Sequence, residues 1–215
     1  MKIINNIRLI LKYPFLLPHN RWNDKVTNWN WVWSNLKVGK IKAALNYIYH
    51  FEYTELDSMP KGWRKIFGEQ MCEDIKQELI RCSKIMGVNK NILLKEYRIL
   101  EIKEKYGTLR WYDNGSPTMS KINDIIDYYE DLSMCYCINC GKPVRYKTLG
   151  YITYVCPECF SNYADKICGA DLKEFKAAHK VTVDDIPTRS VLTSEGWTKR
   201  GSDVDFKTLW GLEEE

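Results

Sequence analysis

The chain has 215 residues, of which 45% are hydrophobic and 28% are charged. This composition is typical of a globular protein with one sizeable core, and the net charge of +4 does not by itself indicate a nucleic-acid partner. Eight cysteines in a chain of this length do not form the dense disulfide framework of a small secreted domain. We therefore expect a reducing, cytoplasmic location, where closely paired cysteines favour metal over disulfide.

The N-terminal segment, residues 1–57, is basic and rich in tryptophan. Residues 1–52 carry eight basic and two acidic side chains, and apolar spacing predicts helices over 3–12 and 40–50. Trp29, Trp31 and Trp33 alternate with other residues, so they would share one face of a strand. They could stack on unpaired bases or contact a partner, or they could pack in a core, where tryptophan is usually found.

Nothing in the sequence indicates insertion into a membrane. The apolar run 9–11 is cut by Lys12 and Pro14, so it cannot be the core of a signal peptide. No stretch of about 18 uncharged apolar residues exists to cross a bilayer. We expect neither a spanning segment nor a membrane partner.

A long amphipathic helix is expected to follow Pro60 and to end near Gly87. Apolar residues recur there every three or four positions, at Trp63, Phe67, Met71, Ile75, Leu79, Cys82 and Met86. Cys72 and Cys82 lie about 15 Å apart along such a helix, so they cannot share a metal. We interpret both as packing residues.

Residues 97–112 are expected to form a β-hairpin that turns through residues 105–107. Leu100 and Ile102 would share one face, while Glu101, Lys103 and Arg110 would lie on the other. These three charged residues could line a polar pocket, or they could form ordinary ion pairs on a solvated face. A second helix is expected over residues 121–133, with Ser120 as its N-cap.

Two Cys-x-x-Cys pairs carry the strongest chemical signal in the chain. Cys137 and Cys140 are followed, after a short hairpin over 144–155, by Cys156 and Cys159. This spacing predicts a four-cysteine zinc ribbon, with iron or a redox pair as alternatives. Four thiolates would fill the tetrahedral shell of Zn²⁺, so its role would be structural. Cys135 is too close to Cys137 to join that turn.

The ribbon also carries interleaved basic and aromatic residues, which are Lys142, Arg145, Tyr146, Lys147 and Tyr151. They could bind nucleic acid or a protein, or they could shield the metal site and keep it soluble. In the C-terminal extension, Trp210 and Leu212 could tether the tail to the body. Alternatively, this tail is a docking segment.

Several motifs resemble a group of uncharacterised bacteriophage-encoded small zinc-ribbon proteins. They are Ile102-Lys-Glu-Lys-Tyr-Gly-Thr-Leu-Arg-Trp-Tyr112, the following acidic helix, Cys-x-x-Cys-Gly-Lys-Pro and the second Cys-x-x-Cys. The segment near the start of the chain, Ile10-Leu-Lys-Tyr-Pro-Phe-Leu-Leu-Pro18 with Arg21-Trp22, also resembles phage protein sequences. The resemblance spans residues 60–160. It implies a viral accessory role in the cytoplasm of a bacterial host, but no reaction and no catalytic residue.

The predicted fold class is α+β, with amphipathic helices packed on a β-hairpin and a four-cysteine zinc ribbon after them. We expect four parts: 1–57, the body 58–133, the ribbon 134–160 and an extension over 161–215. Phosphate loops, dinucleotide fingerprints and nucleophile elbows are missing from the sequence. We therefore expect a non-enzymatic accessory protein that binds a host macromolecule, with a host protein as the expected partner and inhibition of a defence or transcription component as one role. The alternatives are direct nucleic-acid binding, and a small-ligand-binding protein or enzyme with its site near the 97–112 hairpin.

Overall fold

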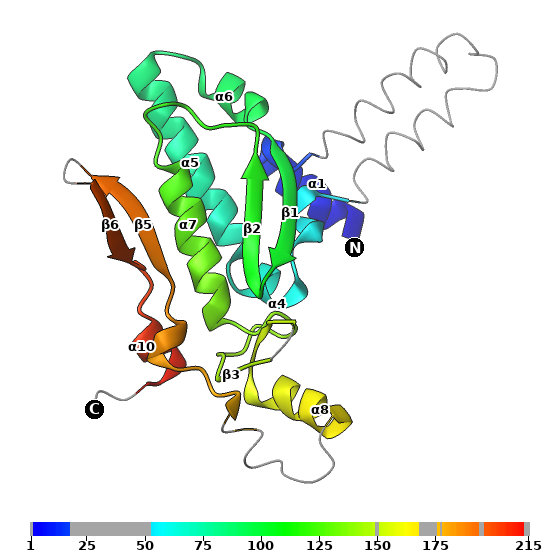
Figure 1. Ribbon diagram of the computed structural model, residues 1–215. Helices are drawn as coiled ribbons and strands as arrows, with labels where there is room; N and C mark the ends of the chain where they lie inside the picture. The colour runs from blue at the N-terminus through cyan, green and yellow to red at the C-terminus, as the bar shows by residue number, and fades with distance from the viewer. Residues whose placement is uncertain are drawn as a thin grey trace, which may run out of the picture. The chain divides into compact units, whose positions relative to one another are not determined.

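The structure, a computed structural model, describes residues 2–17, 53–148, 151–167, 176, 178–193 and 196–212. Its fold is α+β, as the sequence predicts. The α-helices are α1 (Lys2–Lys12), α4 (Lys61–Trp63), α5 (Glu69–Met86), α6 (Lys90–Glu96), α7 (Ile122–Leu132), α8 (Pro157–Ile167) and α10 (Phe206–Trp210). The strands are β1 (Ile99–Lys105), β2 (Thr108–Asp113), β3 (Tyr146–Lys147), β4 (Tyr154–Val155), β5 (Thr188–Thr193) and β6 (Gly196–Gly201). They pair in sequence order as β1–β2, β3–β4 and β5–β6 (Figure 1).

The chain divides into two compact units, each built from separated segments. The first unit contains the described residues of Met1–Ser58 together with Cys72–Ile102 and Trp111–Ile122. The second contains Met59–Met71, Lys103–Arg110 and the described part of Asn123–Glu215. The predicted helix over 40–50 and the three alternating tryptophans, Trp29, Trp31 and Trp33, lie outside the described residues. No described helix is both long and apolar enough to cross a membrane.

The helical run after Pro60 confirms most of the predicted apolar stripe. It begins with α4, passes through a five-residue π-helical turn, η4 (Arg64–Gly68), and continues as α5 to Met86. Six of the seven predicted stripe residues are buried, because the 3.6-residue period keeps them on one side of the helix. Met86 is the exception and is half-exposed, because the helix leaves the core before its last turn. Cys72 and Cys82 are buried, as expected for packing residues.

The first unit has an aromatic and aliphatic core around α1 and α5. Tyr13 and Phe15 follow α1 and are buried, and the Phe15 ring meets the Tyr97 ring edge-on at 5.4 Å. The Tyr13 hydroxyl donates to the Glu73 carboxylate on α5 at 3.0 Å. Tyr97 in turn donates to Asp113 at 2.8 Å and accepts from the indole N–H of Trp111 at 3.0 Å. Each buried polar atom of these aromatic rings therefore has a partner, which lets them pack inside the core.

The β1–β2 hairpin turns through two residues, Tyr106 and Gly107, which is a tighter turn than predicted. Their φ angles are +55° and +79°, as in the type I′ turns that close two-residue hairpins. The predicted face pairing of Leu100 with Ile102 is wrong, because Leu100 is exposed. Ile99 and Ile102 are the buried residues of β1, so burial there does not follow strict alternation.

Ser120 does not cap α7 as predicted, since its buried hydroxyl has no hydrogen-bond partner among the described residues. The backbone N–H of Lys121 instead donates to the Glu78 carboxylate on α5 at 2.6 Å. Arg81 holds the same carboxylate with two hydrogen bonds, at 2.6 and 2.7 Å. The Arg81 bonds lower the pKa of Glu78 from 4.5 to about 2, with help from the Lys121 N–H and against the effect of burial.

We predict that replacing Glu78 with glutamine lowers the free energy of unfolding at pH 7 by about 2 kcal/mol, because it removes a charged acceptor of three N–H hydrogen bonds and of one longer thiol hydrogen bond. The lowered pKa means that the folded state binds the Glu78 proton less tightly than the unfolded state. Its stabilisation is therefore complete above about pH 4.5 and is lost as the pH falls toward about 2.

Urea unfolding of the wild type and of Glu78→Gln between pH 2 and pH 7 measures this difference. The two proteins should differ most near neutral pH and converge in acid. Glu96→Gln, at an exposed carboxylate, is the control and should change stability by less than about 0.5 kcal/mol. A constant difference at every pH would contradict this role for Glu78.

Candidate metal centre

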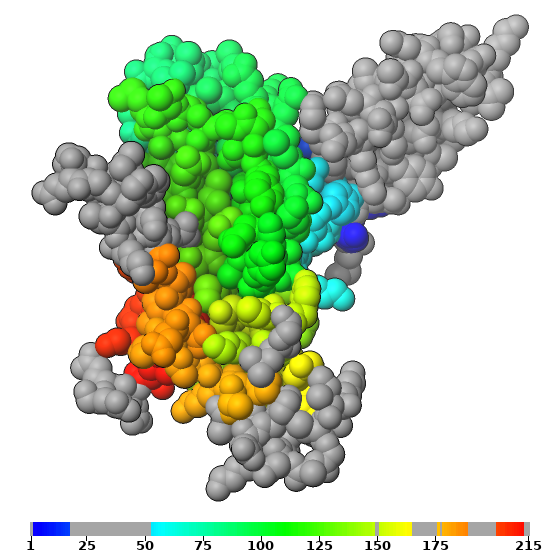
Figure 2. Space-filling model, in the orientation of Figure 1, coloured from blue at the N-terminus to red at the C-terminus, as the bar shows by residue number. Residues whose placement is uncertain are grey.

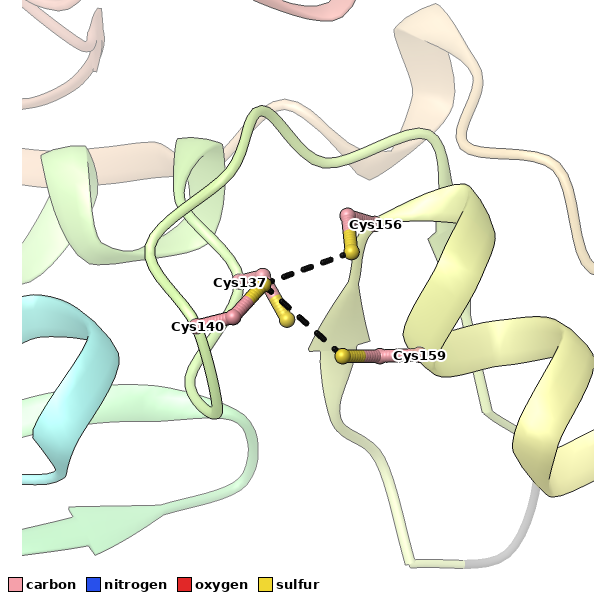
Figure 3. Close-up of side chains that lie close together, drawn as sticks. All are labelled: Cys137, Cys140, Cys156 and Cys159. Atoms are coloured by element: carbon pink, nitrogen blue, oxygen red, sulfur yellow. Dashed lines mark hydrogen bonds between the residues drawn. The ribbon is translucent and has the colours of Figure 1, made fainter.

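The first cysteine pair lies in a tight loop, Cys137–Gly141, which we call the knuckle. The Gly141 N–H donates to the Cys137 carbonyl at 2.8 Å, and the Cys137 N–H donates to the Lys142 carbonyl at 2.8 Å. Gly141 has a φ of +79°, a conformation that a side chain disfavours. These bonds fold the backbone so that Cys137 and Cys140 face the same side (Figure 3).

The second pair, Cys156 and Cys159, lies at the start of helix α8. Helix α8 begins at Pro157, the residue directly after Cys156. Proline is favoured at this first helical position because it lacks the N–H that would have no partner there. Cys156 therefore immediately precedes α8 and Cys159 lies in its first turn, where the helix dipole favours negatively charged thiolates.

The four sulfur atoms converge on one point between the knuckle and the start of α8 (Figure 3). All four Sγ atoms lie within 4.8 Å of one another, and two of the pairs, Cys140–Cys156 and Cys140–Cys159, are 3.5 and 3.8 Å apart. A disulfide would bring two sulfur atoms to about 2.05 Å, so these thiols are not oxidised pairs. Four sulfurs at about 2.3 Å from a tetrahedral metal would be about 3.8 Å apart. The side chains therefore fit a single metal ion.

The protonation of the cluster is uneven. Burial raises the pKa of the Cys156 and Cys159 thiols. Burial also acts to raise the pKa of Cys140, but the backbone N–H of Lys142 and the surrounding thiols outweigh it and the pKa is lowered. Metal binding therefore requires the loss of protons that burial alone would retain.

Cys135 is separate from the cluster, as the sequence predicts. It is buried among apolar residues, including Met134, Val144 and Trp210. Burial, reinforced by the charges of Asp131 and Asp205, raises the pKa of its thiol to about 12. Its sulfur lies outside the group of four that could share a metal ion, so Cys135 is not a ligand of this site.

A short hairpin and an aromatic layer support the metal-binding residues. Strands β3 and β4 pair antiparallel, with Tyr146 opposite Val155 and Lys147 opposite Tyr154. The Tyr146 ring stacks on Phe160 of α8 at 4.5 Å, and both belong to the apolar cluster that contains Cys137 and Cys156. Tyr146, one of the predicted binding residues, therefore shields the cysteine cluster.

The knuckle is docked on the segment that begins the long helical run. The Gly62 N–H donates to the Ile138 carbonyl at 2.9 Å, and the buried Trp63 indole donates to the Tyr136 carbonyl at 2.8 Å. A Cβ atom on Gly62 would lie only 2.0 Å from the Cys137 carbonyl oxygen. Position 62 must therefore be glycine for the two backbones to approach. An isolated glycine inside a helical pattern was the only sequence signal for this contact.

The basic residues of the ribbon are all engaged within the second unit. Lys142 pairs with Glu158 at 2.5 Å, and Lys147 pairs with Asp185. Arg145 donates to the Leu209 carbonyl at 2.9 Å, near the C-terminal end of α10. Trp210 of α10 is buried and stacks on Tyr154 at 6.1 Å, so this helix tethers the tail as the sequence suggested.

The charged residues of the β1–β2 hairpin differ in their surroundings. Arg110 donates to Glu130 on α7 at 2.9 Å, which is an ion pair within the second unit. Lys103 is half-buried, and Glu101 is exposed and belongs to the first unit. The Arg110 and Glu130 side chains are only 30% and 15% exposed, so this ion pair is not one of those expected on a solvated face.

Comparisons with protein-family models, with curated proteins and with solved structures found no match for the chain. The site is therefore interpreted from its own geometry.

We predict that replacing Gly62 with alanine lowers the free energy of unfolding by at least about 3 kcal/mol, because the new Cβ atom overlaps the knuckle backbone. Chemical denaturation of the metal-loaded protein measures the change. Gly201→Ala is the matched control, since a Cβ atom there meets nothing within 4 Å. Equal stability of the two variants would contradict the close approach of Gly62 to Cys137.

Proposed function

We propose that the four cysteines bind one zinc ion and that this ion has a structural role. All-sulfur tetrahedral sites are typical of zinc and of iron. Four cysteine ligands leave no open position for a substrate or a water molecule. Zinc would instead hold together the knuckle, the β3–β4 hairpin and the start of α8, a set of elements too small to be stable alone.

The protein itself is proposed to be a non-enzymatic accessory protein that acts by binding a host protein. The proposed setting, inside a bacterial host, is supported only by the resemblance of its motifs to small phage zinc-ribbon proteins. The observation that carries the binding proposal is the conformation and exposure of Tyr106, in the turn between β1 and β2. Tyr151, in the β3–β4 loop, extends the same surface.

Tyr106 occupies a position that its side chain disfavours. At a φ of +55°, asparagine, aspartate or glycine would be the expected residue, and other residues cost about 1–2 kcal/mol there. The ring is 70% exposed, and the Lys105 ammonium lies 5.4 Å from the ring centroid. The ring contributes little to the core, so a strained and exposed aromatic residue here supports a role in binding.

Tyr151 lies beside this turn. Its hydroxyl donates to one oxygen of the Glu104 carboxylate, and the other oxygen accepts the Gly107 N–H at 2.6 Å. The Tyr151 side chain is 74% exposed, and its neighbour Ile152 is also exposed. We call Tyr106, Tyr151 and Ile152 the tyrosine surface. Exposed aromatic residues are typical anchors of protein interfaces.

The two alternative functions have less support. Nucleic-acid binding through Lys142, Arg145 and Lys147 would have to break contacts that each residue makes within the second unit. The Glu104 carboxylate next to the tyrosine surface would also repel phosphates. A small-ligand site at the hairpin would need Arg110, which is already paired with Glu130.

We predict that tagged wild-type protein, recovered from phage-infected bacterial cells, carries a stable protein partner and that the Tyr106→Asn/Tyr151→Ser double variant does not. Asparagine tolerates the turn conformation, so Tyr106→Asn alone should keep or raise the free energy of unfolding, by up to about 1 kcal/mol. Loss of the partner by the double variant would therefore report on binding and not on a loss of folding stability.

Tyr128→Ser is the control, because Tyr128 is an exposed tyrosine of α7 outside the tyrosine surface. It should retain the partner. Full recovery of the partner by the double variant would contradict the assignment of this surface, and the absence of any partner with the wild type would contradict the function.

We predict that the purified protein contains one zinc ion per chain and that the Cys137→Ser/Cys156→Ser double variant contains none. Elemental analysis measures the metal content. Cys135→Ser should retain the full content because its thiol lies outside the cluster. Stoichiometric iron would contradict the identity of the metal, and zinc in the double variant would contradict its location.

A further inference from the structure

We propose that the turn between α5 and α6 is a docking site for an anionic lipid bilayer. We use the name "turn" for residues 84–92, which include the last residues of α5 and the first residues of α6. These residues belong to the first unit, and all nine are exposed. It presents four large apolar side chains, Ile85, Met86, Val88 and Ile92. This surface goes beyond the proposed zinc-dependent function and does not rest on it.

The four exposed apolar side chains of the turn lie close together in the sequence. The stripe that α5 buries ends at Cys82 and Ser83, and the helix then continues for one more turn outside the core. The blue-green atoms of this stretch lie at the surface in the space-filling view (Figure 2). Exposed aliphatic side chains are common singly, but four within eight residues form a patch that marks an interaction site.

The backbone of the turn is already hydrogen-bonded, which lowers the cost of removing it from water. Val88 N–H donates to the Ser83 carbonyl at 3.0 Å, around Gly87 at a φ of +65°. This bond closes the C-terminal end of α5. Asn89 caps α6 by accepting the Asn91 N–H at 2.9 Å. Few peptide groups would therefore lose hydrogen bonds to water on entering a bilayer interface.

Every charged side chain between Leu79 and Lys95 is basic, and the nearest acidic residues along the chain are Glu78 and Glu96. No acidic residue occurs from Leu79 to Lys95, while Lys84, Lys90 and Lys95 flank the apolar side chains. None of these three lysines forms an ion pair within the part of the chain that the structure describes. The basic helix α1 differs, because its Lys12 is paired with Glu73 at 3.2 Å.

The chemistry of the patch fits a bilayer better than a protein or a nucleic acid. Protein interfaces are enriched in aromatic residues and arginine and depleted in lysine, whereas this patch has lysine and no aromatic residue. Aliphatic side chains cannot stack on bases as aromatic rings do. Aliphatic side chains at the boundary of the acyl chains, with lysines at the phosphates, are the pattern of surface-bound proteins. Such docking needs no spanning helix, and it differs from the sequence-based expectation that the protein has no membrane partner.

Co-sedimentation of the metal-loaded full chain with lipid vesicles tests the proposal. Vesicles of phosphatidylcholine with about one third phosphatidylserine should bind about 100-fold more tightly than phosphatidylcholine alone, because three lysines contribute about 1 kcal/mol each. The Lys84→Gln/Lys90→Gln variant should lose about 30-fold of the affinity for the anionic vesicles. Ile85→Ser/Ile92→Ser should lose at least about tenfold on both vesicles, since it removes apolar side chains from the interface.

Leu100→Ser and Leu11→Ser are matched controls, because both leucines are exposed in the first unit outside the patch. Both should bind vesicles like the wild type, and circular dichroism should show unchanged folding in every variant. Absence of binding to anionic vesicles, or equal binding to both kinds, would overturn the proposal. Loss of binding in Leu11→Ser, with the turn variants unaffected, would also overturn it by moving the contact to α1.

Discussion

The packing of Gly62 against the knuckle is the contact on which the second unit depends. Two carbonyl groups of residues 136 and 138 accept hydrogen bonds from Trp63 and Gly62, and the Cys137 carbonyl leaves no room for a side chain at position 62. These carbonyls point correctly only while the knuckle keeps its shape. Backbone hydrogen bonds fold the knuckle, and a metal bound by the four converging sulfur atoms would fix its shape. Metal binding would then be coupled to the packing of Gly62 and Trp63.

The same coupling explains where function can reside. A four-cysteine shell has no open position for chemistry, and the nearby basic residues are occupied by contacts within the unit. The tyrosine surface is exposed in the same unit, and Tyr106 there has an unfavourable backbone conformation. In the proposed function the metal would stabilise the unit and the exposed tyrosines would contact a partner.

The amino-acid sequence predicts those features that depend on local spacing. The period of the apolar residues predicts α5, and the two Cys-x-x-Cys pairs predict the cluster and exclude Cys135, because these patterns depend on helix and turn geometry alone. Features that depend on distant partners were missed. From the sequence alone, Gly62 looks like an ordinary helical glycine, and only the structure shows that the knuckle backbone lies against it. Likewise, Ser120 looks like an N-cap, but in the structure the Lys121 N–H donates to Glu78. Arg145 looks like a binding residue in the sequence, but in the structure its side chain donates to the Leu209 carbonyl of α10.

The coupling of the metal to the helical run can be tested at the Trp63 indole. Proton–deuterium exchange of this N–H, followed by nuclear magnetic resonance and assigned with a Trp63→Phe variant, reports directly on its bond to the Tyr136 carbonyl. We predict that the Trp63 indole N–H exchanges slowly in the metal-loaded protein and fast after a chelator removes the metal, because the knuckle then loses its shape. Equally slow exchange with and without metal would contradict the claim that the four cysteines, through their metal, hold the knuckle against Gly62 and Trp63.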